Sequence, residues 1–207
     1  MGLREAKKLR TRQEIADQAM RLFVERGFDR VTVAEVAAAA NVSQKTVFNY
    51  FPTKEDLFFD EVPAREAALV EAIRSCDAGE SIVSAFRRMQ VAECGRLCTP
   101  SFAVFARIID ESAALQAKEL EIMVRFNRVI VRELRTVLGV DERDAQIAAN
   151  LLLSIHWQLF RDARAQALAG KHGPRAERAL RADLERAYDL LEHGLGGLTR
   201  PSATATA

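Results

Sequence analysis

This chain of 207 residues has few of the features that mark membrane-bound or secreted proteins. No apolar run reaches the roughly 20 residues that a helix needs to cross a bilayer. The N-terminus is basic, and it lacks the apolar core of a signal peptide. We therefore expect a cytoplasmic protein that has no membrane partner.

Signals for β-strands are also scarce. The chain contains two Tyr and one Trp, and no long stretch alternates Val, Ile or Thr with polar residues. Ala, Leu, Arg and Glu, which are compatible with helices, dominate instead. A hydrophobic content of 49% with 29% charged residues is sufficient for a real core. We predict an all-α fold.

Residues that carry metal or covalent chemistry are few and scattered. The three Cys are an odd number, which argues against a disulfide framework. Cys94 and Cys98 share a helix face and could form a thiol sensor or two soft metal ligands, although Cys is more often a small buried residue. His156, His172 and His193 lack metal-ligand spacing. Without a nucleophile–base pair, phosphate loop or nucleotide fingerprint, we expect no enzyme, cofactor or metal site.

The net charge is only +1, but the charges are unevenly distributed. Five cations crowd the N-terminus against the single acid Glu5: Arg4, Lys7, Lys8, Arg10 and Arg12. Beside a duplex, such an arm would contact phosphates and add affinity without sequence information. On its own, the same arm would be better explained as a solvated run of charge.

Residues 32–57 contain three helix starts in close succession. Each is marked by a side-chain oxygen that can cap it: Thr32 with Glu35, Ser43, and Thr53 with Asp56. Asn41 suits the left-handed conformation in which a helix ends. The small side chains of residues 37–40 allow two helices to cross closely at a steep angle. The pattern predicts a helix-turn-helix.

The second helix of this pair has two different faces. Val47 and Phe51, four residues apart, would pack inward. The outward positions carry donors, acceptors and one cation, but no acid: Gln44, Lys45, Thr46, Asn49 and Tyr50. These groups suit the base edges and phosphates of DNA.

At these residues the chain resembles the TetR family of transcriptional regulators. The matching parts are the helix opened by Thr32, the turn at residues 41–43, the aromatic-rich helix 46–51, and Lys54. The resemblance implies that the major groove is contacted by Ser43, Gln44, Lys45, Thr46 and Asn49, and phosphates by Thr32, Tyr50 and Lys54. Phe48 stands where the family often has a phosphate-binding Tyr, and Tyr50 could supply a hydroxyl nearby.

We accordingly divide the chain into three parts. Residues 1–54 would form a three-helix DNA-binding domain, whose first helix runs from Thr11, paired with Glu14, to Gly27. Residues 55–198 would form a helical effector-binding and dimerisation domain, and residues 199–207 a disordered tail. Pro63 would kink or break the linking helix. In the resembled family, displacement of this helix changes the spacing of the recognition helices and releases DNA.

Large or adaptable side chains recur on four successive helices of the second domain, where they line an effector pocket or fill a core. Two amides among them could orient a ligand. The set comprises Phe86, Met89, Gln90, Phe102, Phe105, Met123, Phe126, Asn127, His156 and Trp157. Its chemistry favours a mostly apolar or planar compound.

The last two helices carry apolar residues at the spacing of a bundle seam. The resemblance implies that each subunit contributes both helices to a four-helix dimer interface. The alternative is that they close the core of a single chain. The candidate interface residues are Leu151, Ile155, Leu180, Leu184, Leu191 and Leu195.

The sequence thus predicts a homodimeric, DNA-binding transcriptional regulator, with release from a near-palindromic operator by a small, mostly apolar effector as the leading mechanism. Its partners would be double-stranded DNA, the effector and a second copy of the chain. The alternative is a helical module that acts through a protein partner or binds a small molecule without specific DNA recognition.

Overall fold

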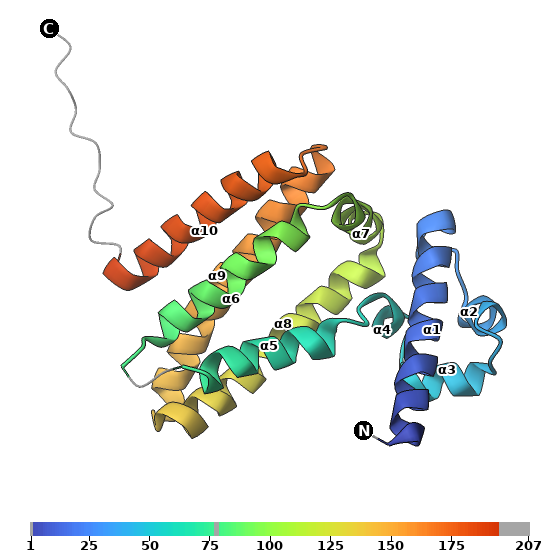
Figure 1. Ribbon diagram of the computed structural model, residues 1–207, viewed down its shortest axis with the longest axis horizontal. Helices are drawn as coiled ribbons and strands as arrows, with labels where there is room; N and C mark the ends of the chain where they lie inside the picture. Colours follow the sequence, from blue (N-terminus) through green and yellow to red (C-terminus); the bar gives the residue numbers. More distant parts are fainter. Residues whose placement is uncertain (1, 77–78, 195–207) are drawn as a thin grey trace, which may run out of the picture.

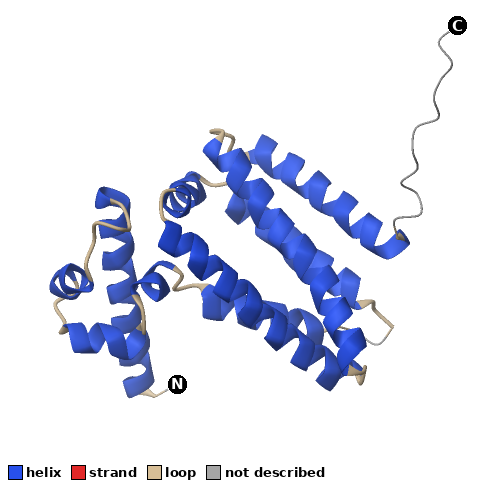
Figure 2. Cartoon of the chain, turned by 180° about the vertical axis from the view of Figure 1, so that it is seen from behind, coloured by secondary structure: helices blue, strands red, loops and turns tan. Residues whose placement is uncertain are grey.

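The computed structural model describes residues 2–76 and 79–194. Within these ranges the chain forms ten helices and no strand (Figures 1 and 2), which confirms the predicted all-α fold. None of these helices has the length and apolarity that crossing a membrane requires. Leu195 and the tail predicted at residues 199–207 lie outside the described residues.

Three helices form the N-terminal domain, at the right of Figure 1: α1 (Leu3–Arg26), α2 (Val33–Ala39) and α3 (Gln44–Tyr50). Helix α1 begins eight residues before the predicted start at Thr11. Lys, Leu and Arg before Thr11 are good helix formers, so its hydroxyl lies inside the helix instead of at its cap. The helix ends at Gly27, as predicted.

The predicted starts of α2 and α3 are confirmed. Thr32 and Glu35 cap each other reciprocally, because the Thr32 amide donates to the Glu35 carboxylate at 2.8 Å and the Glu35 amide to the Thr32 hydroxyl at 3.3 Å. Asn41 has a φ of +53°, the left-handed conformation expected at the turn. The Ser43 hydroxyl then accepts from the Thr46 amide at 3.1 Å.

The link between the domains breaks a few residues before Pro63, where the sequence predicted a kink or break. Helix α4 (Lys54–Phe58) starts at the reciprocal cap of Thr53 and Asp56, and α5 (Val62–Arg74) follows a short turn. Pro63 lies in the first turn of α5, where a missing N–H costs no helical hydrogen bond. The chain therefore changes direction at residues 59–61, just before the proline.

Five helices complete the larger domain: α6 (Ile82–Leu97), α7 (Pro100–Asp110), α8 (Ala113–Leu138), α9 (Glu142–Leu168) and α10 (Pro174–His193). Gly139, with a φ of +67°, ends α8, and Asp141 caps α9, both as predicted. In Figure 1, α10 lies along the outer side of the bundle, and it packs on α6 and α9.

This packing corrects the predicted dimer residues. Leu180, Leu184 and Ile155 are at most 8% exposed and belong to the core of this chain, and Leu191 is half-buried against it. For Ile155, Leu180 and Leu184, the alternative that the helices close a single chain therefore holds, whereas the interface role of Leu191 stays a prediction. Leu151, by contrast, is 47% exposed.

The two domains share their packing at the corner between α7 and α8. Ile108, Ile109 and Leu115 are buried in the core of the N-terminal domain, although they lie far along the chain. The Ser112 hydroxyl donates to the Asp29 carboxylate at 2.8 Å beside them. The orientation of the helix-turn-helix therefore depends on contacts with the larger domain.

The Lys54 side chain folds back onto the N-terminal domain, where it makes hydrogen bonds within the chain. Its ammonium donates to the backbone carbonyls of Phe28 at 3.1 Å and Val31 at 3.2 Å, and it lies 4.2 Å from the centre of the Phe28 ring. This side chain ties α4 to the loop between α1 and α2. Lys54 thus has an intramolecular role, and its predicted phosphate contact stays a prediction.

We expect Lys54→Met to lower the free energy of unfolding by about 1–3 kcal/mol, because two carbonyls lose a charged donor while the apolar stem is retained. The measurement is urea denaturation followed by circular dichroism. Lys45→Met, at an exposed position of α3, is the matched control and should change stability little. Equal stability of the Lys54 variant and the control would contradict the role given to Lys54.

Candidate functional site

Helix α3 presents a polar face beside a buried one. Val47 and Phe51 are at most 2% exposed, and they fix the helix against the N-terminal core as predicted. Gln44, Lys45 and Asn49 are exposed, and no acidic residue occurs in α3. The exposed face therefore offers donors, acceptors and a cation that can approach DNA.

The other predicted DNA contacts are more constrained. The hydroxyls of Thr32 and Ser43 are occupied as caps, and Thr46 lies 2.8 Å from the Ser43 hydroxyl. Tyr50 is half-buried against the N-terminal core. Phe48, by contrast, is 48% exposed. An exposed Phe can make apolar contact with a thymine methyl but cannot donate to a phosphate.

The basic arm forms the first turns of α1. Arg4, Lys7 and Lys8 are exposed, whereas Arg10 pairs with Glu14 at 3.5 Å. Arg12 turns away from this surface: its guanidinium donates to the Asp60 carbonyl at 2.8 Å and lies over the Phe51 ring at 4.7 Å. Arg12 therefore contacts the link between the domains.

A cavity of about 520 Å³ lies between this link and the larger domain. Its walls come from α1, the end of α4 and the turn after it, the start of α5, the corner between α6 and α7, and helices α7, α8 and α9. Seven of the lining residues are Phe or Trp: Phe58, Phe59, Phe102, Phe105, Phe126, Trp157 and Phe160. The Phe126 and Trp157 rings stack with centres 5.7 Å apart. An apolar ligand with flat faces fits such walls.

The cavity includes half of the predicted pocket residues. Phe102, Phe105, Phe126, His156 and Trp157 line it. Phe86, Met89 and Gln90 lie earlier on α6, and Met123 and Asn127 follow Ile122 and Phe126 by one position. A step of one residue turns a side chain by about 100°, which directs these two away from the cavity. Asn127 instead contacts Asn150 and Gln146 on α9, at 2.8 and 2.9 Å.

Several residues that line the cavity were not predicted from the sequence. Phe160 follows His156 by four positions and so shares its face of α9, a signal that could have been used. Arg65, Arg96 and Arg164 also line the cavity, but their pattern in the sequence is that of ordinary surface charge. Only the fold brings them together.

His156 is the one histidine in this cavity, and it is 6% exposed. Neither ring nitrogen has a hydrogen-bond partner. Burial, with a smaller contribution from the nearby Arg65 guanidinium, lowers the pKa of His156 to about 3. The ring is therefore neutral near pH 7 and presents one donor and one acceptor.

Comparison with known proteins agrees with this architecture. Residues 15–60 match the family model for bacterial regulatory proteins of the tetR family. The regulator TcmR of Streptomyces glaucescens is 27% identical over 185 residues, which cover 81% of this chain and 82% of that protein. Residues 15–60 thus carry a DNA-binding domain of the TetR family type, and the similarity to TcmR extends over both domains of the chain.

Further regulators resemble the chain over shorter segments or mainly in fold. LuxR of Vibrio harveyi is 48% identical over 54 residues, 26% of each chain. The repressor FadR of Thermus thermophilus, solved with lauroyl-CoA, aligns with a TM-score of 0.55 at 25% identity over 95% of this chain and 99% of FadR. Together with the match at residues 15–60, these relatives support a DNA-binding transcriptional regulator, and they do not point to an enzyme.

The cysteines of this regulator are poorly placed for redox chemistry. Cys94 and Cys98 are buried. Burial raises the pKa of the Cys94 thiol to about 11, and it also raises that of Cys98. Since the thiolate is the reactive form, both side chains fit the small apolar role that the sequence analysis left open.

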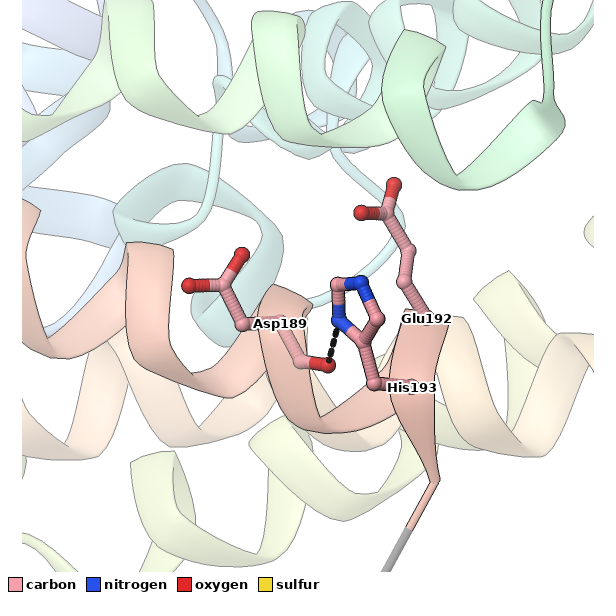
Figure 3. A group of neighbouring side chains, drawn as sticks. All are labelled: Asp189, Glu192 and His193. Atoms are coloured by element: carbon pink, nitrogen blue, oxygen red, sulfur yellow. Dashed lines mark hydrogen bonds between the residues drawn. The ribbon is translucent and has the colours of Figure 1, made fainter.

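Asp189, Glu192 and His193 bring three possible metal ligands together on the exposed end of α10 (Figure 3). Both carboxylates already pair with Arg87, at 2.9 and 3.1 Å. The His193 Nδ1 lies 2.9 Å from the Asp189 carbonyl, a contact drawn in Figure 3. The cluster is therefore explained by ion pairs and a helix-end contact.

The buried His156 predicts a pH dependence of stability. Its folded pKa lies below its unfolded value of 6.5, so the unfolded chain binds the extra proton between these values, and acid favours unfolding. From pH 7.5 to pH 5.5, this residue alone should remove about 1.4 kcal/mol of stability. Urea denaturation at both pH values should show a smaller loss for His156→Phe.

His172→Phe, at an exposed position between α9 and α10, is the matched control and should keep the full loss. Both variants retain the carboxylates, so the difference between them isolates His156. If wild type and His156→Phe lost equal stability over this interval, the buried neutral state would be wrong.

Proposed function

We propose that this regulator is a homodimeric repressor, and that a small ligand in the cavity releases it from a near-palindromic operator. The observation that carries the proposal is the position of Phe58, Phe59, Asp60 and Glu61. These residues line the cavity, and they also join the helix-turn-helix to the larger domain. A ligand that fills the cavity therefore contacts the link directly.

The link is held from both sides. On the side of the N-terminal domain, Arg12 binds the Asp60 carbonyl. On the other side, the Phe58 ring stacks on Phe105 of α7 with centres 4.6 Å apart. Displacement of these rings by a ligand would move α4 and change the orientation of α3. Only a ligand with different affinities for the two arrangements can shift their populations.

Gln44, Lys45 and Asn49 are the side chains we assign to base edges, because they are exposed on α3. Arg4, Lys7 and Lys8 would contact phosphates from α1. Thr32, Ser43 and Thr46 shape the helix ends through their capping contacts, so their predicted contacts with the duplex would be secondary to those of the exposed side chains. Two copies would place two such helices about 34 Å, one turn of DNA, apart.

The second copy would cover the outer face of α9. Ile147 and Leu151 lie four residues apart on this helix and are 50% and 47% exposed. Leu190 of α10 is also exposed, at 41%. A two-fold axis would bring each such patch against its copy. This surface replaces the buried residues that the sequence analysis assigned to the interface.

Ligand control has a precedent among the relatives, since T. thermophilus FadR was solved with lauroyl-CoA. In this chain, the aromatic lining supports a ligand that is largely apolar. We therefore expect DNA release to be driven by burial of apolar ligand surface in the cavity.

Selection of genomic fragments by the purified protein, followed by footprinting at physiological salt, tests DNA recognition. We expect a protected, near-palindromic site, and we expect Lys45→Ala to weaken binding to it by about 1–3 kcal/mol and relax its sequence preference. Lys171→Ala, exposed in the loop before α10, should leave binding unchanged. Diffuse, salt-labile binding without a shared motif would instead favour a helical module without specific DNA recognition.

Sedimentation equilibrium tests the interface. Leu151→Glu should convert the dimer to monomers, because it places a charge at the centre of an apolar contact. Leu120→Glu, at a 64% exposed position on α8, is the control and should remain dimeric. Monomers from the α8 variant but not from Leu151→Glu would place the interface on α8 and overturn our assignment.

A further inference from the structure

The charged groups around the cavity balance one another. Three arginines and three carboxylates line it: Arg65, Arg96, Arg164, Asp60, Glu61 and Glu119. Glu61 pairs with Arg65 at 3.3 Å and with Arg96 at 2.6 Å, and Glu119 pairs with Arg164. Asp60 lies 3.8 Å from Arg12. Among the described residues that line the cavity, every cation thus already has an anionic partner.

An anionic ligand would compete with these carboxylates for the same arginines. Releasing a carboxylate from its arginine inside a partly buried site leaves a charge without compensation, which is costly. A cationic ligand meets the same obstacle, because the carboxylates are also engaged. The charge arrangement therefore selects against ionised ligands and favours neutral ones.

His156 differs from these groups because its polar atoms have no partner. Both ring nitrogens are buried without a hydrogen bond, although a buried polar atom is normally satisfied. The ring is neutral and can donate from one nitrogen and accept at the other. Neither nitrogen is accessible in the free protein, so a ligand oxygen would satisfy the ring after a shift that turns one nitrogen toward the cavity. A hydroxyl could use either nitrogen, and a carbonyl could accept from the donor.

The surroundings of His156 favour a ring next to that oxygen. The centres of the Trp157 and Phe160 rings lie 5.1 and 4.9 Å from the His156 ring, and that of Phe126 lies 6.2 Å away. These distances are typical of packed aromatic groups. A flexible acyl chain would gain apolar contact here, but it would leave the nitrogens unsatisfied.

We propose that the ligand of this cavity is a neutral aromatic compound whose hydroxyl or carbonyl oxygen hydrogen bonds to His156. The inference rests on the proposed effector role of the cavity, and it adds the chemical class of the effector and the residue that selects it. The aromatic walls provide affinity for the ring system. His156 provides discrimination between an oxygenated ring and the parent hydrocarbon.

Isothermal titration calorimetry with naphthalene, 2-naphthol and 2-naphthoate tests this inference. A hydrogen bond to a preformed buried partner should make 2-naphthol bind about fivefold more tightly than naphthalene. The ionised 2-naphthoate should bind more weakly than both. In His156→Phe the advantage of 2-naphthol over naphthalene should disappear, whereas His172→Phe should retain it.

A second variant separates this inference from the proposed function. Ile122 lines the cavity, and Ile122→Trp should fill it and weaken naphthalene and 2-naphthol alike. If Ile122→Trp left both affinities unchanged, the compounds would bind elsewhere, and the effector role of the cavity would fail. A folded state equal to that of wild type, checked by thermal denaturation, is required for this comparison.

Two results would overturn the role of His156 while leaving the cavity as the effector site. The first is that the wild-type protein binds naphthalene and 2-naphthol with equal affinity, and that Ile122→Trp weakens the binding of both. The other is tighter binding of 2-naphthoate or lauroyl-CoA than of 2-naphthol, which would show that the cavity accepts an anion. Loss of the 2-naphthol preference in His156→Phe alone would establish the inference.

Discussion

The shared packing of two cores around one short turn constrains the rest of this structure. Phe58 is 1% exposed and contacts the rings of Phe23 and Phe28 in the N-terminal domain, as well as Phe105 of the larger domain. Neither core can repack without moving this ring, because protein interiors are close-packed. The orientation of α3 and the shape of the cavity are therefore two consequences of the same contacts.

Local chemistry explains why much of the fold could be predicted from the sequence. Helix ends depend on groups within four residues, so they can be predicted from the local sequence. Examples are the caps at Thr32, Ser43 and Thr53, the left-handed turn at Asn41 and the end of α8 at Gly139. The predicted start at Thr11 was wrong for a related reason. A capping pair inside a run of good helix formers does not begin a helix, since propagation costs less than a new nucleus.

The roles of individual side chains were harder to predict, because they depend on distant partners. Lys54 binds carbonyls that lie 26 and 23 residues away, and Arg12 reaches Asp60 across the domain link. The leucines of α10 have the spacing of a seam, but spacing does not reveal whether the facing helix belongs to the same chain. The burial of Leu180 and Leu184 against this chain decides that question.

His156 marks a candidate binding site because its buried, unsatisfied nitrogens lower the stability of the free protein. A buried imidazole without partners destabilises the free protein by about 1–3 kcal/mol, whereas an apolar residue of similar size would fill the same space without that penalty. The cost is recovered when a ligand supplies the missing hydrogen bond, so stability and binding are linked through one residue. The ligand therefore favours the arrangement in which its oxygen reaches the ring. Since the cavity also borders Phe58 and Asp60, the proposed mechanism would transmit that preference to the link that orients α3.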